Sequence, residues 1–111
     1  MEKKTEIVIS KIAEYVDRIE IYCKEIKTAQ ELEENTMCLE AVCFDIIQIG
    51  ELAKLGLTDE LKSGIKSIPW NQINGLRNRI VHGYGEINKS IIWEVIQEDL
   101  PKLKEELRRI K

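Results

Sequence analysis

Apolar residues recur every three or four positions along residues 8–26, and this spacing constrains the fold more than any other feature of the chain. The stripe consists of Val8, Ile12, Tyr15, Ile19, Tyr22 and Ile26. Because an α-helix completes one turn in about 3.6 residues, side chains with this spacing lie on one face of a helix. The sequence therefore predicts a long amphipathic helix that buries one face against other helices.

A second helix is predicted from about residue 36 to residue 55, after a short acidic segment over residues 28–35. Its middle is apolar nearly all round, which is typical of a helix packed on more than one side. Gly56 is placed to end it. Thr58, which is followed by acidic residues, has the character of an N-cap for a short third helix.

The second half of the chain continues the helical pattern. A fourth helix is expected from about residue 70 to residue 81 or 82, and Gly83 and Gly85 follow it. Asn88 can cap a fifth helix. Within that helix Pro101 removes one backbone donor, so a kink or a break is expected there.

Length and composition agree with one helical domain. A chain of 111 residues can form one core, and 43% apolar with 33% charged residues is typical of amphipathic helices. We expect an all-α fold, a four-to-five-helix up-and-down bundle, forming a single domain over residues 1–111. No apolar run approaches the ~18 residues of a membrane span. The charged N-terminus has no signal-peptide core, and three cysteines without a Cys-x-x-Cys pair suggest core thiols, so we expect a cytoplasmic protein.

The positive charge of the chain is local. The net charge is −3, which by itself disfavours a general nucleic-acid binder. Residues 1–60 hold seven basic and fourteen acidic residues, whereas residues 61–89 hold five basic residues against Glu86 alone. The only histidine, His82, lies in this basic stretch. The stretch is therefore the candidate site for an anionic ligand.

A compact group of chemically capable side chains lies within the basic stretch. Arg77 has a planar, permanently charged guanidinium that suits phosphate oxygens, and His82 can serve as an acid or a base near neutral pH. Asn74 and Asn78 add neutral hydrogen-bonding groups one turn apart, and Tyr84 adds a phenol. One histidine, no cysteine cluster and no nearby group of carboxylates argue against a metal site. No cofactor is expected.

The spacing of Arg77 and His82 favours a site made by two chains. Five residues apart, they are separated by about 140° on a regular helix, so they do not converge within one chain unless the helix end is distorted. Acid–base hydrolysis also usually needs two proton-transfer groups, and the chain has one histidine. A two-fold dimer supplies two imidazoles and two guanidiniums around one cleft, so we expect a homodimer.

Each of these residues also has a structural interpretation. His82 can stabilise the C-terminal end of a helix, where positive charge is favourable, and Tyr84 can be a packing residue. Arg79 can be a solvated surface charge. Trp70 and Trp93 are better explained as core anchors than as stacking platforms. An Arg-x4-His pattern alone is therefore a weak sign of catalysis.

The pattern around Arg77 resembles the signature of the HEPN superfamily, and specifically of its HepT-like branch. That signature is an arginine, commonly followed by a polar residue, and then a histidine after four to six residues; here these are Arg77, Asn78 and His82. The HepT-like branch extends it by one residue and a tyrosine, matched by Gly83 and Tyr84. Further stretches that resemble the branch at matching separations are residues 49–54, 68–70 and 93–101. The resemblance covers essentially the whole chain.

The resemblance implies a HEPN-like fold and a metal-independent ribonuclease toxin of a type VII-like toxin–antitoxin system, acting on RNA as a homodimer. It implies that Arg77 and His82 carry catalysis. It also implies a partner, a minimal nucleotidyltransferase antitoxin, that silences the enzyme by transferring AMP to Tyr84, which would add bulk and phosphate charge at the mouth of the cleft. The residues expected to support RNA binding are Asn74, Asn78 and Arg79.

Tyr84 is expected to be the tyrosine that an enzyme can reach. It lies between Gly83 and Gly85 and should sit on a mobile, solvent-facing turn. Tyr15 and Tyr22 fall on the apolar stripe of the first helix, so their hydroxyls should be less accessible.

Two positions depart from the branch, and two rival functions stay open. Gly85 stands where relatives often have an aromatic residue, and Asp45 stands where many have asparagine. The first rival is a binding module, in which the groove holds a nucleotide or substrate for the partner nucleotidyltransferase and performs no chemistry. The second is a structural helical adaptor, which leaves the Arg–His–Tyr grouping unexplained.

Overall fold

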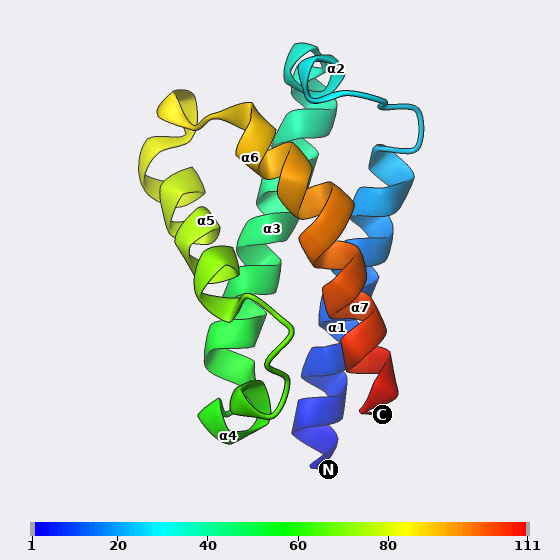
Figure 1. Ribbon diagram of the computed structural model, residues 1–111, viewed down its shortest axis with the longest axis vertical. Helices are drawn as coiled ribbons and strands as arrows, with labels where there is room; N and C mark the ends of the chain where they lie inside the picture. The colour runs from blue at the N-terminus through cyan, green and yellow to red at the C-terminus, as the bar shows by residue number, and fades with distance from the viewer. Residues whose placement is uncertain (1, 111) are drawn as a thin grey trace.

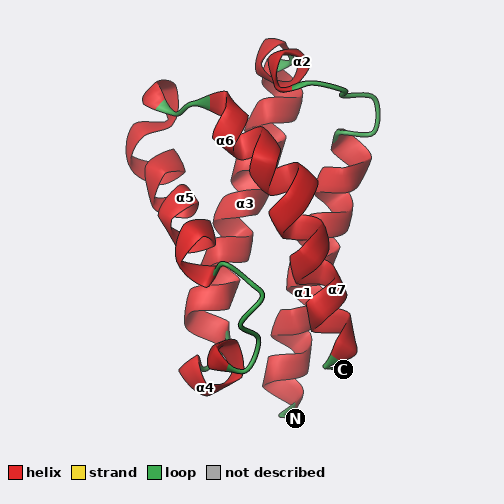
Figure 2. Cartoon of the chain, viewed as in Figure 1, coloured by secondary structure: helices red, strands yellow, loops and turns green. Residues whose placement is uncertain are grey.

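The computed structural model describes residues 2–110, and every regular element in that part of the chain is helical (Figures 1 and 2). The helices are α1 (Lys3–Tyr22), α2 (Ala29–Glu34), α3 (Thr36–Gly56), α4 (Asp59–Ser63), α5 (Trp70–Gly83), α6 (Lys89–Glu94) and α7 (Leu100–Arg109). A 3₁₀ turn (Tyr84–Glu86) follows α5, and a π-helical turn (Val95–Asp99) joins α6 to α7. The expected all-α fold is confirmed. None of the helices within residues 2–110 is long and apolar enough to cross a membrane.

Helix α3 lies at the centre of the bundle. It packs against α1 on one side and α5 on the other, and α7 packs against α1 (Figure 1). Helix α2 lies over one end, in contact with α3 and α6. The four long helical segments α1, α3, α5 and α6–α7 alternate in direction, which is the up-and-down arrangement that the sequence predicts.

One face of α1 is buried, as its apolar spacing predicts. The buried residues of this helix are Val8, Ile9, Ile12, Val16 and Ile19. The expectation for Tyr22 is wrong, because its side chain is 42% exposed. The predicted stripe assumed a helix that reaches Ile26, whereas α1 ends at Tyr22 with Cys23 as its C-cap. Beyond this point the helical spacing no longer places side chains on the buried face.

Capping and close packing define the helix ends as predicted. Thr58 Oγ1 accepts a hydrogen bond of 3.1 Å from a backbone amide at the start of α4, and Asn88 Oδ1 accepts one of 2.8 Å at the start of α6. Helix α3 ends at Gly56, where a Cβ atom would lie 2.7 Å from Cγ2 of Val8. Glycine therefore lets α1 and α3 approach closely at this end of the bundle.

The backbone irregularity associated with Pro101 lies in the helical turn that precedes the proline. The helix is not broken: the backbone of Leu100 has φ −69° and ψ −41°, and α7 continues to Arg109. Instead, Val95–Asp99 widens into a π-helical turn. A proline ring clashes with the carbonyl of the fourth preceding residue, here Gln97, and the wider turn relieves that clash.

Among residues 2–110, one charged side chain is buried in the core. Asp45 on α3 is 3% exposed, and its Oδ2 atom has no hydrogen-bond partner among residues 2–110. Burial raises the pKa of this carboxyl, and the nearby Arg18 acts in the opposite direction. The three cysteines are unpaired thiols in or against the core, as predicted: Cys23 and Cys43 are buried and Cys38 is half-buried.

Candidate active site

Helix α5 carries the Arg–His pattern on a regular backbone. Ile73, Leu76 and Ile80 face the core, which fixes the orientation of the other side chains. Because the helix stays regular through His82, the expected separation of about 140° between Arg77 and His82 applies. Arg77 is half-buried beside α3, whereas His82 is exposed in the last helical turn.

The guanidinium of Arg77 is held by two partners. Its Nη2 atom forms an ion pair with Oε1 of Glu51 on α3, and its Nη1 atom donates a hydrogen bond of 2.8 Å to Oδ1 of Asn78. The side chains of Arg77 and Glu51 are 21% and 34% exposed, so this pair is partly shielded from solvent. Arg77 Nε is buried and has no partner among residues 2–110. The arrangement fixes the direction of the guanidinium and leaves donors free for an anion.

A glycine on α3 makes room for Arg77. A Cβ atom at Gly50 would lie 2.9 Å from both Cβ and Cγ of Arg77. Any larger residue at this position would displace the arginine stem and, with it, the Glu51 pair. Neither Gly50 nor Glu51 stands out by its local pattern, although both lie in residues 49–54, one of the stretches that resemble the HepT-like branch.

The two asparagines lie on the Arg77 side of α5. Asn78 bonds Arg77 directly. Asn74, one turn earlier, lines a cavity of about 100 Å³ together with Gly50 and Lys54, and its Oδ1 atom is buried without a partner among residues 2–110. Asn78 thus contacts Arg77, whereas Asn74 lies beside Gly50, the glycine that makes room for the Arg77 stem. Their role in binding phosphate stays a prediction.

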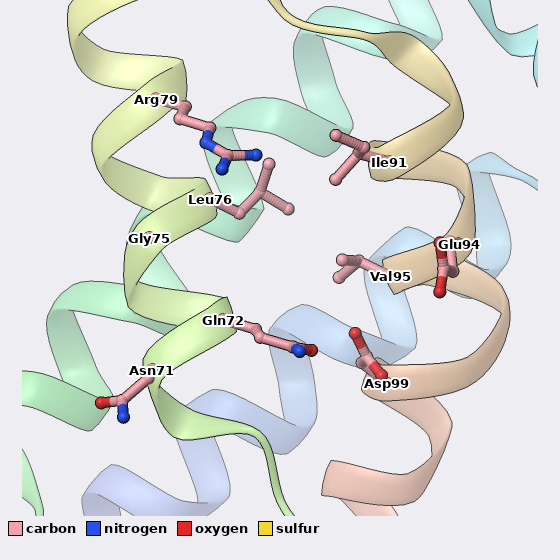
Figure 3. Close-up of a pocket in the computed structure, with 9 residues that line it drawn as sticks. All are labelled: Asn71, Gln72, Gly75, Leu76, Arg79, Ile91, Glu94, Val95 and Asp99. Atoms are coloured by element: carbon pink, nitrogen blue, oxygen red, sulfur yellow. The ribbon is translucent and has the colours of Figure 1, made fainter.

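Arg79 lies on a different flank of the helix. About 200° of rotation separates it from Arg77, and it lines a groove between α5 and the α6–α7 segment (Figure 3). The structure therefore does not bring Arg79 into the Arg77 cluster within one chain.

His82 and Tyr84 follow each other at the end of α5. Within residues 2–110 no hydrogen bond or ion pair engages the imidazole of His82. Tyr84 begins the 3₁₀ turn, in which Gly85 and Glu86 are exposed, and its own side chain is half-buried against the core. The ammonium of Lys89 lies 5.2 Å from the centroid of its ring. Burial raises the pKa of the Tyr84 phenol, and the nearby Cys43 and Glu40 add to the rise.

An apolar surface borders the Arg77–Glu51 pair. Phe44 and Leu55 lie seven residues before and four residues after Glu51, on the same outer face of α3, and they are 56% and 76% exposed. On α5, Val81 is 44% exposed and lies one turn after Arg77. We call Phe44, Leu55 and Val81 the outer apolar surface. Exposed aliphatic and aromatic side chains around a polar pair are typical of surfaces that bind another protein.

Among residues 2–110 no group of three or more His, Cys, Asp or Glu side chains is arranged to hold a metal ion. The chemically capable groups of the candidate site are the guanidinium of Arg77, which Glu51 and Asn78 contact, and the exposed imidazole of His82.

Comparison with known proteins gives a family match over nearly the whole chain. The profile of a family described as HepT-like, Ribonuclease HepT-like, matches residues 12–110. No solved structure matches significantly.

Two relatives illustrate the range of similarity. A Methanocaldococcus jannaschii protein, named as a gamma-glutamylcyclotransferase and candidate RNase, is 33% identical over 110 residues, which cover 99% of this chain and 49% of that protein. A Thermococcus cleftensis protein named probable ribonuclease HepT is 25% identical over 115 residues, covering 100% of this chain and 99% of that protein. This chain thus spans about half the length of the first relative and nearly all of the second.

Proposed function

Since this chain belongs to the HepT-like ribonuclease family, we propose that it is a metal-independent ribonuclease toxin whose residues 1–111 act as one catalytic domain. The observation that carries the proposal is the guanidinium of Arg77, oriented by Glu51 and Asn78 on the helix that exposes His82. A fixed guanidinium suits the charge that develops on a scissile phosphate, and an exposed imidazole suits proton transfer.

The proposed reaction uses the RNA as its own nucleophile. The 2′-oxygen forms a bond to phosphorus while the bond from phosphorus to the 5′-oxygen breaks. One imidazole accepts the 2′-hydroxyl proton and a second imidazole donates a proton to the departing 5′-oxygen. Arg77 holds the non-bridging phosphate oxygens, and Glu51 keeps the guanidinium aligned during the reaction.

Two imidazoles require two chains, because each chain has one histidine. The outer apolar surface supports this dimer, since it borders the Arg77–Glu51 pair and has the exposed side chains that an interface would bury. In a two-fold dimer through this surface, Arg77 of one protomer and His82 of its partner approach one cleft.

The products of cleavage test the proposed reaction. A short RNA incubated with the protein in EDTA should be cut and should end in a 2′,3′-cyclic phosphate or the phosphate derived from it, because the 2′-hydroxyl is the readiest nucleophile without a metal. DNA of the same sequence should stay intact. Mass spectrometry of the digest reads both results. Loss of cleavage in EDTA, 3′-hydroxyl ends or equal cutting of DNA would contradict the mechanism.

We further propose that a minimal nucleotidyltransferase partner silences the enzyme by adding AMP to Tyr84. The residue lies two positions after His82, so an attached AMP would lie beside the cleft. Lys89, above the ring, supplies a cation near the phosphate that the modification adds. AMP at this position would compete with RNA for the same basic groups.

A Tyr84→Phe variant should escape this inactivation while keeping its nuclease activity, because the phenol oxygen takes no part in cleavage. The variant and the wild type are incubated with the partner, ATP and magnesium, and mass spectrometry locates the adduct. Tyr22→Phe is the matched control, since Tyr22 is exposed and also offers a phenol. An adduct on Tyr22 or Tyr15, or full silencing of Tyr84→Phe, would assign the modification elsewhere.

One observation favours a second candidate, a nucleotide- or substrate-binding subunit without its own activity. Glu51 neutralises part of the charge of Arg77, which lowers the attraction of the site for a phosphate. This candidate predicts binding of nucleotides without cleavage of RNA under any of the conditions above, so the product assay separates it from the nuclease.

A further inference from the structure

A groove of about 440 Å³ lies between α5 and the α6–α7 segment, on the flank of α5 that faces away from Arg77. Its volume is in the range of small-molecule sites. Both apolar and polar side chains line the groove (Figure 3). The apolar lining consists of Leu76, Ile91 and Val95, and the polar lining includes Gln72, Arg79 and Asp99.

Gly75 leaves one wall of the groove bare. Close packing explains two other helical glycines, since a Cβ atom would meet Arg77 at Gly50 and Val8 at Gly56. At Gly75 a Cβ atom would meet no atom of residues 2–110 within 4 Å. Glycine within a helix is less favourable than alanine, and no packing contact in that part of the chain requires it here. The bare helix surface therefore provides space for a flat ligand to lie against α5.

The groove ends in an amide, carried by α5, and a carboxyl on the opposite wall. The π-helical turn carries Asp99, and Asp99 and Gln72 point toward one another across the groove (Figure 3). Burial raises the pKa of the Asp99 carboxyl, and the neighbouring Glu94 and Glu98 raise it further. The charged form of a carboxyl in such surroundings is stabilised when a ligand donates N–H groups to it.

We propose that this groove binds a guanine base of the RNA substrate, with the Asp99 carboxylate accepting from N1–H and N2–H and the Gln72 amide donating to O6. Guanine is the RNA base whose Watson–Crick edge offers two adjacent donors followed by an acceptor, which is the complement of a carboxylate beside an amide. The apolar lining packs against the base plane. This inference rests on the proposed ribonuclease function and adds a base preference to it.

The groove is positioned to work with the catalytic groups. Gly75, Arg79 and His82 follow one another at intervals of four and three residues, so they lie along one side of α5. Gly75 and His82 are roughly 10 Å apart along the helix axis, a separation that neighbouring nucleotides of a single strand can bridge. Arg79 lies between them and supplies a cation for the intervening phosphate.

Binding of mononucleotides tests the groove without requiring cleavage. Calorimetric titration should show guanosine 5′-monophosphate binding roughly tenfold or more tightly than the adenosine, cytidine and uridine monophosphates, as expected for bidentate recognition. Asp99→Asn should remove this preference. Glu98→Gln, a change to an exposed carboxylate of the same turn that does not line the groove, should retain it.

A variant that fills the groove provides a second test of the proposal. Gly75→Leu should abolish binding of guanosine monophosphate while the thermal midpoint stays the same or rises, because leucine favours the helix and the space is open. In an RNA set that differs at one nucleotide, wild-type cleavage should occur next to guanine, and Gly75→Leu should lose that preference.

The outcomes separate the two proposals. Guanosine monophosphate bound at the groove without any RNA cleavage would support the groove and refute the nuclease. RNA cleavage without base preference, and equal binding of the four mononucleotides, would refute the groove and leave the nuclease standing. Unchanged nucleotide binding by Gly75→Leu, with loss of binding to the nucleotidyltransferase, would reassign the groove to a protein partner.

Discussion

Replacing His82 by alanine should lower RNA cleavage by about 10²–10⁴-fold, the usual contribution of a general acid or base. The imidazole is exposed and makes no hydrogen bond or ion pair within residues 2–110, so the helical circular-dichroism signal should not change. Arg77→Ala should lower RNA cleavage by about 10²–10³-fold, because the charge that develops on the phosphate is then less stabilised. Lys11→Ala, which removes an exposed charge on α1, serves as the control. Undiminished cleavage by His82→Ala would point to another mechanism.

Mixing wild-type and His82→Ala chains tests whether one cleavage event uses the imidazoles of both protomers. If it does, a mixed dimer has one imidazole in place of two and should be nearly inactive. After subunit exchange at equal concentrations, cleavage should fall to roughly half of its value before exchange, since a quarter of the dimers, and no longer half of them, then have two imidazoles. Unchanged cleavage, with exchange verified by mass spectrometry, would mean that each chain cleaves with its own histidine.

Replacing Phe44 by aspartate should convert the dimer into a monomer and lower cleavage by at least ~100-fold, because a monomer has one proton-transfer group in place of two. The side chain is 56% exposed in the monomer, so a carboxylate there is tolerated by the fold, whereas burying it at an interface without a partner is costly. Sedimentation at micromolar concentration and the RNA assay measure the two effects.

The matched control is Ile21→Asp, which places the same charge at an apolar position of α1 that is 70% exposed and lies outside the outer apolar surface. It should remain dimeric and active. A wild-type protein that sediments as a monomer and still cleaves RNA would remove the composite-site argument, and so would a monomeric Phe44→Asp variant with full activity.

The features of this protein that depend on neighbouring residues in the chain can be predicted from the sequence alone. Apolar spacing predicts the buried face of α1, and Thr58 and Asn88 predict helix starts through caps that involve residues two or three positions away. The Arg–His–Tyr pattern is likewise a local feature, so it can be found, together with its family, without coordinates. Such features depend on neighbours in the chain, which the sequence contains directly.

Only the tertiary structure decides which distant side chains meet. Glu51 orients Arg77 because α3 and α5 pack closely at Gly50, and no spacing along the chain reveals that contact. Tyr22 is exposed because α1 stops there, and Arg79 lies in a groove with Asp99 because the π-helical turn before Pro101 shapes the facing wall. These outcomes depend on where each helix ends and how two helices fit together, since both are set by the packing of the whole core.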